Sequence, residues 1–206
     1  MRAAVLRTYN DDLSLEQVAD PACAPDGVVL RVLACGICRS DWHGWTGEHP
    51  RVKPGQIPGH EYCGEVVEAG AQSTWQVGDR VVAPFILACG ACPDCQSGHG
   101  NICARQRLPG FTEPGAFAEF ISVPFAHNLA RLPDSLSPAV AAEMSRFQSG
   151  QFAKPENALK RAVSLFPPRL PRLLWRLNDA AAASLISWDA MTAFLRRLVV
   201  VWRERC

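Results

Sequence analysis

The sequence lacks long hydrophobic runs, and this absence predicts that it has no membrane-spanning helix. No stretch reaches about 18 consecutive apolar residues, the length that a transmembrane helix needs. The first residues, MRAAVLRTYNDD, contain neither a long apolar segment nor a small-residue cleavage site, so they do not predict a secretory signal peptide. We therefore expect no membrane span and a cytoplasmic location, where the nine cysteines stay reduced.

A dinucleotide-binding motif is also missing. The chain contains no G-x-G-x-x-G, no alternation of strands with helices and no internal repeat. A Rossmann domain needs on the order of 130–180 residues, whereas 56 residues follow position 150. The sequence therefore predicts no Rossmann domain in residues 151–206.

Neither sign of charge dominates the whole chain, which has 21 Lys and Arg against 20 Asp and Glu. The balance changes along it, however: residues 1–150 hold 11 basic and 16 acidic side chains, and residues 151–206 hold 10 and 4. The basic tail interleaves its charges with Leu and Ala and lacks the Gly-aromatic organisation of RNA-binding proteins, so it does not indicate nucleic-acid binding. We expect two segments of different kind.

The most informative feature that is present is a run of four cysteines. Cys89, Cys92, Cys95 and Cys103 follow the spacing C-x2-C-x2-C-x7-C in CGACPDCQSGHGNIC. The short gaps let successive sulfurs of a turning loop aim at one point, and four thiolates with no open position are typical of structural Zn²⁺. Two disulfides and a four-iron cluster remain as alternatives.

Residues 1–133 have the texture of an all-β barrel or sandwich, with short alternating or apolar runs separated by Gly and Pro. Helical periodicity is weak in this part. Gly78 and Asp79 predict the tight turn that opens one strand. Six strands are expected, at residues 3–6, 13–18, 28–34, 65–70, 79–84 and 116–123.

After Pro133 the texture changes. An Asp/Ser start and an Ala-rich body predict a helix over 134–147 that begins near Ser137. Three prolines make 166–175 an extended or linker-like segment, and apolar residues at three- and four-residue steps predict an amphipathic helix over 179–205. This helix would pack on the β domain or a partner subunit, lie on a membrane surface, or belong to a tail with no evolved role.

A second group of metal-ligating residues precedes the four cysteines. Cys38 follows a predicted strand, and His60 stands in the tetrad PGHE at the start of the next one, so the two side chains can converge. A site with two or three protein ligands keeps an open position, as catalytic zinc does. Taken singly, each residue also fits a buried core position, Cys35 and Cys38 fit a redox pair, and Ser40 and Asp41 fit a turn or a helix cap.

Five segments in the same order then resemble one family: CGICRSDWH, GHEYCGEVVEAG, VGDRVV, CGACPDCQSGHGNIC and GAFAEFISVP. Residues 1–147 resemble the catalytic domain of zinc-dependent alcohol dehydrogenases of the medium-chain dehydrogenase/reductase family. The resemblance implies a mainly β, GroES-like barrel over 1–133 with a structural zinc lobe at 85–105. Residues 134–150 would be a helical remnant of the inter-domain segment, followed by a short helical or irregular, divergent basic tail at 151–206.

The resemblance also implies roles for individual residues. Ser40 matches the hydroxyl that hydrogen-bonds the substrate alcohol, and His43 matches the histidine that passes its proton to solvent. Arg39 matches a residue that approaches the cofactor pyrophosphate. Cys38 and His60 match two ligands of the catalytic zinc, and Glu61 matches the acid beside that metal. The ligands of the structural zinc are matched by Cys89, Cys92, Cys95 and Cys103.

The implied reaction is oxidation of a small-molecule alcohol to an aldehyde or ketone with NAD(P)⁺. Zinc acts as a Lewis acid that lowers the pKa of the bound alcohol, a hydroxyl and a histidine relay the proton, and a nicotinamide takes the hydride. A barrel face without its nucleotide domain would favour association of chains into a homo-oligomer. The sequence does not specify the alcohol, or NAD against NADP.

Two departures from the family pattern point to an alternative. Ser145 stands in EMSRF where the family has its third zinc-ligating cysteine, and serine is a weak zinc ligand. Glu61, Asp41 or a water would have to replace it. With no Rossmann motif after 150, two hypotheses account for the tail: a shifted reading frame or fused segment, and a genuine short protein with a helical tail. A non-catalytic zinc-binding module with a GroES-like fold is the alternative function.

Overall fold

The computed structural model describes residues 1–144, and their side chains as far as Ala142. Ser145, the expected linker at 166–175, the expected helix at 179–205 and the proposed change of reading frame all lie outside the described residues.

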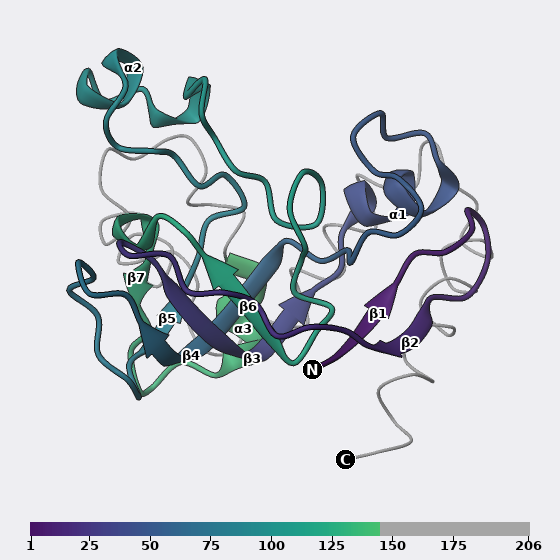
Figure 1. Ribbon diagram of the computed structural model, residues 1–206, viewed down its shortest axis with the longest axis horizontal. Coiled ribbons are helices and arrows are strands. Elements are labelled where there is room, and N and C mark those ends of the chain that lie inside the picture. The colour runs from purple at the N-terminus through teal and green to yellow at the C-terminus, as the bar shows by residue number, and fades with distance from the viewer. Residues whose placement is uncertain (145–206) are drawn as a thin grey trace.

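The described part is built mainly from antiparallel strands in two sheets (Figure 1). β1 (Arg2–Val5) and β2 (Ser14–Gln17) form a two-stranded sheet. The other sheet has five strands in the order β6-β3-β4-β5-β7 and is not closed. Its strands are β3 (Val28–Gly36), β4 (Glu61–Ala69), β5 (Arg80–Val82), β6 (Phe120–Val123) and β7 (Ala130–Arg131). The expected mainly β class is confirmed.

Alternation of apolar residues along the strands divides the five-stranded sheet into two buried faces. On one face Val28 and Leu30 of β3 pack with Val66 of β4 and with side chains of β5 and β6. On the other face Cys63 and Val82 pack with residues of the C-terminal helix. Because both faces are covered, the position of each strand end is well defined.

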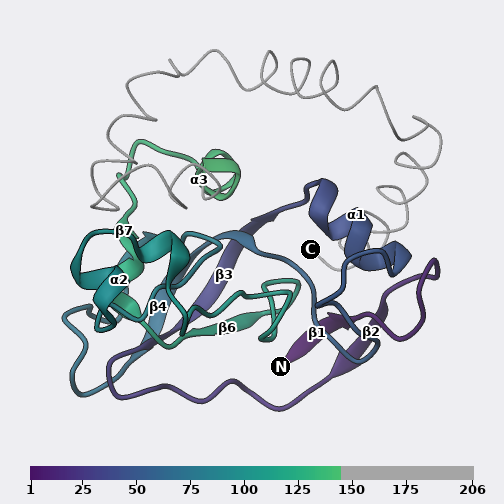
Figure 2. The same ribbon diagram turned by 90° about the horizontal axis from the view of Figure 1, so that it is seen from above.

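The helix α3 (Pro138–Met144) covers the second face, where it packs on β3 and β4 (Figure 2). It begins where the sequence predicted, after Ser137, whose hydroxyl accepts a hydrogen bond from the Val140 amide at 3.5 Å. The Cys63 thiol of β4 contacts the Pro138 carbonyl at 3.2 Å. The predicted helix is therefore present over the described residues.

The helix α1 (Arg39–Thr46) lies between β3 and β4, in a part where sequence periodicity indicated no helix. Its start is fixed by Asp41, whose carboxylate Oδ2 accepts the amide hydrogen of Cys38 at 2.9 Å. Its end is fixed by Gly47, which adopts φ +83°, in the left-handed region. Capping at both ends, rather than an apolar stripe, explains this short helix.

The segment with the four cysteines forms a lobe that projects from the sheet (Figure 1). It contains the short helix α2 (Pro93–Gln96) and the 3-10 turn η1 (Gly100–Ile102). At its base the backbones of Leu87 and Arg107 exchange two hydrogen bonds of 2.9 Å. A second 3-10 turn, η2 (Ala126–Asn128), follows β6. No helix among residues 1–144 is long and apolar enough to cross a membrane.

Two candidate metal centres

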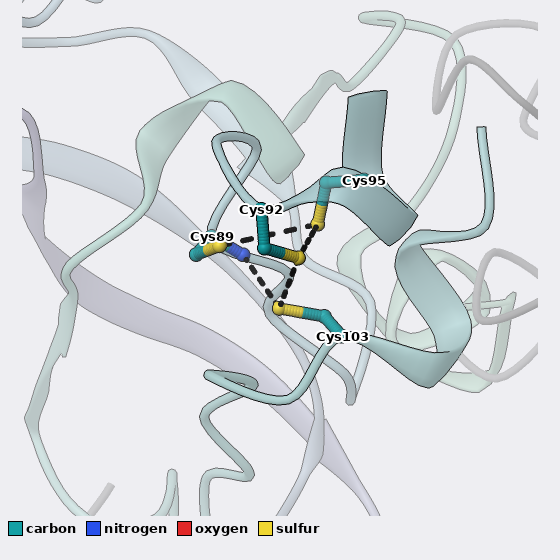
Figure 3. Close-up of side chains that lie close together, drawn as sticks. All are labelled: Cys89, Cys92, Cys95 and Cys103. Atoms are coloured by element: carbon teal, nitrogen blue, oxygen red, sulfur yellow. Dashed lines mark hydrogen bonds between the residues drawn. The ribbon is translucent and has the colours of Figure 1, made fainter. Parts of the chain in front are cut away.

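The four cysteines of the lobe direct their sulfurs toward one another (Figure 3). The Sγ atoms of Cys92 and Cys95 are 3.4 Å apart, those of Cys92 and Cys103 3.7 Å, and those of Cys89 and Cys95 4.0 Å. All four lie within 4.8 Å of one another. A loop, α2 and the residue after η1 thus bring four sulfurs to one point, and their role as metal ligands stays a prediction.

The sulfur spacing fits zinc better than it fits disulfides. Four sulfurs at about 2.3 Å from one Zn²⁺ stand about 3.8 Å apart, and the three distances lie on both sides of this value. Two sulfurs of a disulfide would be about 2.05 Å apart, and all eight cysteines of the described residues are free thiols.

The local electrostatics favour release of protons from this cluster. The backbone amide of Ala91 is the main cause that lowers the pKa of Cys89 to about 6. Backbone hydrogen bonding also lowers the pKa of Cys92, whereas burial and the neighbouring thiols raise that of Cys95 to about 12. The lowered pKa values of Cys89 and Cys92 favour thiolates, the form of cysteine that binds a metal ion.

A second cluster forms where β3 ends and β4 begins. The two strands are antiparallel, with Gly36 opposite Glu61, so the residue after β3 and the residue before β4 are neighbours in space. Cys38 precedes α1 on one side and His60 precedes β4 on the other. Gly59 allows the close approach of this corner, since it adopts φ +95° and a Cβ there would lie 2.6 Å from the Phe117 ring.

Three polar side-chain atoms converge at this corner. Cys38 Sγ lies 3.2 Å from His60 Nε2 and 2.8 Å from Ser40 Oγ, and Ser40 Oγ lies 3.1 Å from His60 Nε2. Tetrahedral zinc ligands of this kind stand about 3.6 Å apart, within a few tenths of an ångström of the observed sulfur–nitrogen distance. The donor set of one thiol and one imidazole therefore fits zinc.

Asp41 connects both members of this cluster. Its Oδ1 lies 3.2 Å from His60 Nδ1, and both side chains are at least 95 % buried. The Nδ1 atom has no well-aligned hydrogen-bond partner among the described residues, so the contact is an ion-pair approach. Burial lowers the pKa of His60, but the negative charge of Asp41, together with Cys38, outweighs burial and raises it to about 10.

Glu61 lies beside the same corner, 4 % exposed, at the first position of β4. Its carboxylate lies close against Gly36, where a Cβ would stand only 2.8 Å from Glu61 Oε2. The position of this carboxylate therefore depends on the absence of a side chain at Gly36.

His43 and Arg39 extend the cluster along α1. His43 Nδ1 is 2.5 Å from Glu48 Oε2, and the His43 side chain is 34 % exposed, so it reaches solvent. The Arg39 Nε atom is buried and has no hydrogen-bond partner among the described residues. An unsatisfied guanidinium nitrogen at this place suits an anion.

The apolar wall of the site is aromatic. The Phe111 ring centroid lies 4.7 Å from that of His60 and 4.6 Å from that of His49. Phe85 approaches His60 edge-on, with 6.2 Å between the ring centroids. Rings on this side exclude water from the histidine and suit an apolar part of a ligand.

The structure brings together most of the residues that the sequence singled out. Cys38, Ser40 and His60 meet at one corner, with Glu61 beside them, and His43 lies further along α1. Sequence reasoning missed the contact of Asp41 with His60. The sequence indicated Asp41 as a turn or cap residue and as a possible replacement for the missing metal ligand, but its contact with Nδ1 of His60 depends on the position of β4.

Comparisons with known proteins agree with this geometry. The family model for the alcohol dehydrogenase GroES-like domain matches residues 24–134, more than half of the chain. An L-threonine 3-dehydrogenase of Chelativorans sp. (strain BNC1) is 36 % identical over 146 residues, which are 69 % of this chain and 42 % of that protein. The chain thus spans about two fifths of the length of the curated relatives it matches.

Two solved structures share the fold. The alcohol dehydrogenase TADH from Thermus sp. ATN1 has a TM-score of 0.63 and 40 % identity, covering 67 % of this chain and 42 % of that one. A zinc-binding dehydrogenase from Sinorhizobium meliloti 1021, bound to NADP, has a TM-score of 0.60 and 37 % identity, covering 68 % and 41 %. With its GroES-like domain, its mainly β fold and these relatives, the chain belongs to the zinc-dependent alcohol dehydrogenases of the medium-chain dehydrogenase/reductase family.

Proposed function

We propose that this chain supplies the zinc- and alcohol-binding part of an alcohol dehydrogenase, which oxidises a small alcohol to an aldehyde or ketone with NAD(P)⁺. One observation carries the proposal: Cys38 Sγ, Ser40 Oγ and His60 Nε2 lie within 3.2 Å of one another at the end of β3. The relatives named as threonine and alcohol dehydrogenases support this reaction class.

Two zinc ions belong to the proposal. Cys89, Cys92, Cys95 and Cys103 would hold the structural ion, and Cys38 and His60, with Glu61 as the neighbouring acid, would hold the catalytic one. At the second site zinc supplies a Lewis acid for the alcohol oxygen. Asp41 is the outer partner of His60, because its two oxygens already face His60 Nδ1 and the Cys38 amide.

The proton path uses two side chains of α1. The Ser40 hydroxyl would take the proton of the alcohol as it releases its own, and His43, which is partly exposed, would pass a proton on to solvent. The Phe111 ring keeps water away from the buried side of His60. These groups hold and move the proton while the hydride leaves in the opposite direction.

A nicotinamide cofactor is the proposed hydride acceptor. The buried and unsatisfied Nε atom of Arg39 supports an anionic group at this end of α1. The NADP in the Sinorhizobium meliloti structure supports the cofactor class. The proposal extends to a cytoplasmic protein that forms homo-oligomers, with 1–133 as the catalytic domain, 85–105 as its lobe, 134–150 as a helical remnant and 151–206 as a divergent basic tail.

Metal content tests the proposal most directly. We expect two zinc ions per chain in the wild type. Cys38→Ala should keep only the ion of the four-cysteine site, and Cys92→Ala should lose that ion. Formation of reduced nicotinamide from a panel of primary and secondary alcohols, with NAD⁺ and with NADP⁺, tests the activity. Zinc-replete chain that produces no reduced nicotinamide would refute the activity of this chain.

The alternative is a non-catalytic zinc-binding module that keeps the GroES-like fold. The substitution of Ser145 for the expected third cysteine favours it, although that residue lies outside the described part. One zinc per chain, unaffected by Cys38→Ala and removed by Cys92→Ala, would support the module over the enzyme.

A further inference from the structure

Asn128 makes a set of contacts that neither metal site explains. Its side chain is 92 % buried, in the turn η2 after β6. The Asn128 Oδ1 atom accepts the amide hydrogen of Ala88 at 3.0 Å, and its Nδ2 donates to the Ala88 carbonyl at 2.9 Å. The side-chain amide of Asn128 thus forms both a donated and an accepted hydrogen bond with the backbone of Ala88, as a neighbouring strand would. Ala88 directly precedes Cys89, so these bonds hold the backbone next to one of the four cysteines.

The same turn supports the next residue of the lobe. The His127 ring lies against Gly90, where a Cβ would stand 2.8 Å from His127 Nε2. Gly90 adopts φ +71°, so its conformation and the space for the ring both require glycine. Residues on both sides of Cys89 are therefore held by one turn that comes from a distant part of the sequence.

We propose that Asn128 is a positioning residue for the structural metal centre, and that η2 acts as the socket in which the loop from Ala88 to Cys92 is held for zinc. The inference rests on the zinc assignment of the proposed function. Outer groups that fix the backbone of a ligand reduce the conformational freedom that metal binding must remove. Without Asn128, the base of the lobe would keep the Leu87–Arg107 pair and the packing of His127 on Gly90, but lose the two hydrogen bonds to Ala88.

The socket also carries a natural optical probe. Trp75 Nε1 donates to the Ala126 carbonyl at 2.9 Å, so the indole is bonded to the first residue of η2. Arg131 lies over the same ring, 5.2 Å from its centroid. Removal of the metal from the lobe should loosen η2 and change the emission of Trp75.

The test uses the full chain loaded with Co²⁺, whose thiolate charge-transfer band reports on the four-cysteine site alone when the chain carries Cys38→Ala. The band is followed after addition of excess EDTA. We expect Asn128→Ala to lose cobalt about tenfold faster than the parent, or more. Asn101→Ala is the matched control, because Asn101 lies in the lobe itself and is exposed, and its rate should stay within twofold of the parent.

Asn128→Asp is the rescue variant. It keeps the acceptor for the Ala88 amide but loses both donors, so its rate of cobalt release should lie between those of the parent and Asn128→Ala.

Tryptophan emission, measured while metal is removed from the parent chain, gives a readout that needs no Asn128 variant. Trp75→Phe identifies which indole causes the change. Equal release rates for Asn128→Ala, Asn101→Ala and the parent would overturn the inference but leave the zinc assignment standing. Trp75 emission that does not change when the metal is removed would have the same meaning. A parent chain without the thiolate band would overturn the zinc assignment and the inference together.

Discussion

The carboxylate of Asp41 lies 3.2 Å from Nδ1 of His60, while its other oxygen holds the amide of Cys38 at 2.9 Å. One buried acid therefore fixes the orientation of the imidazole and the start of the helix that carries the thiol. A carboxylate behind a histidine sets the tautomer in which Nε2 is left to bind a metal.

Replacing Asp41 with Asn should weaken metal binding at the second site. The amide keeps the shape and an acceptor for the Cys38 amide but removes the charge behind His60. We expect affinity for zinc at this site to fall about tenfold to hundredfold, measured by competition with a chelator. The thiolate band of cobalt at the four cysteines serves as the internal control, because it should be unchanged. Equal affinities at the second site would refute the role of Asp41.

Gly36→Ala should displace the carboxylate of Glu61. The new methyl group would stand 2.8 Å from Glu61 Oε2, and the carboxylate is 4 % exposed with little room to move. We expect a loss of unfolding free energy of about 1–3 kcal/mol, measured by chemical denaturation. Adding Glu61→Ala should recover part of this loss, since it removes the atom that clashes. A double variant whose loss equals the sum of the two single losses would contradict this explanation.

Tyr62→Phe should stabilise the protein. The Tyr62 side chain is fully buried, and its hydroxyl has no hydrogen-bond partner among the described residues. Removing an unsatisfied group avoids its desolvation penalty, so we expect a gain of about 1 kcal/mol in unfolding free energy. Tyr9→Phe is the matched control and should lose about 1 kcal/mol, because the Tyr9 hydroxyl donates to the Val52 carbonyl at 3.0 Å.

The same tyrosine has a consequence for alkaline stability. Burial raises the pKa of Tyr62 far above its usual value. A group with a raised pKa contributes stability that is present below its unfolded pKa, about 10, and is lost as the pH rises above it. Above about pH 10 the wild type should therefore lose stability faster than Tyr62→Phe. Parallel pH profiles for the two proteins would contradict the burial of this hydroxyl.

Asp79→Asn should remove part of the acid sensitivity of the fold. The hydrogen bonds from Arg131, first, and from the Gln76 amide lower the pKa of Asp79. A lowered pKa gives stability that is present above the unfolded value of about 4 and is lost as the pH falls through the folded value. We expect Asp79→Asn to be less stable than the wild type at pH 6 and to approach it at pH 3, by urea denaturation. Asp134→Asn, at a fully exposed carboxylate, should show no such convergence.

Much of the fold follows from the sequence, because its strands are short apolar runs bounded by Gly and Pro. The expected strands near residues 3, 13, 28, 65, 79 and 116 each correspond to an observed one. Three differ clearly in extent. β4 begins earlier, at Glu61, and β5 covers only Arg80–Val82. β6 covers only Phe120–Val123, because Ala118 pairs instead with Ala3 of β1. Strand limits depend on partners, which a single segment of sequence does not reveal.

The elements that sequence reasoning missed are short, and they are held by capping at their ends or by pairing with a distant strand. The helix α1 has eight residues and no apolar stripe that would announce it, and its ends are fixed by Asp41 and Gly47. Strand β7 has two residues and exists because Ala130 and Arg131 pair with β5. The four-cysteine site was predictable because its ligands are local. The second site needed the register of β3 and β4, which places Gly36 opposite Glu61.

The antiparallel pair of Leu87 and Arg107 gives the lobe a property of its own. Two reciprocal backbone hydrogen bonds hold the points where the chain leaves the sheet and returns to it. Because the two ends are adjacent, the chain between them could be exchanged for a tight turn, or for a longer excursion, without moving β5 or β6. The lobe is in this sense an interchangeable part, and evolution of this family could alter or delete it while leaving the corner with Cys38 and His60 in place.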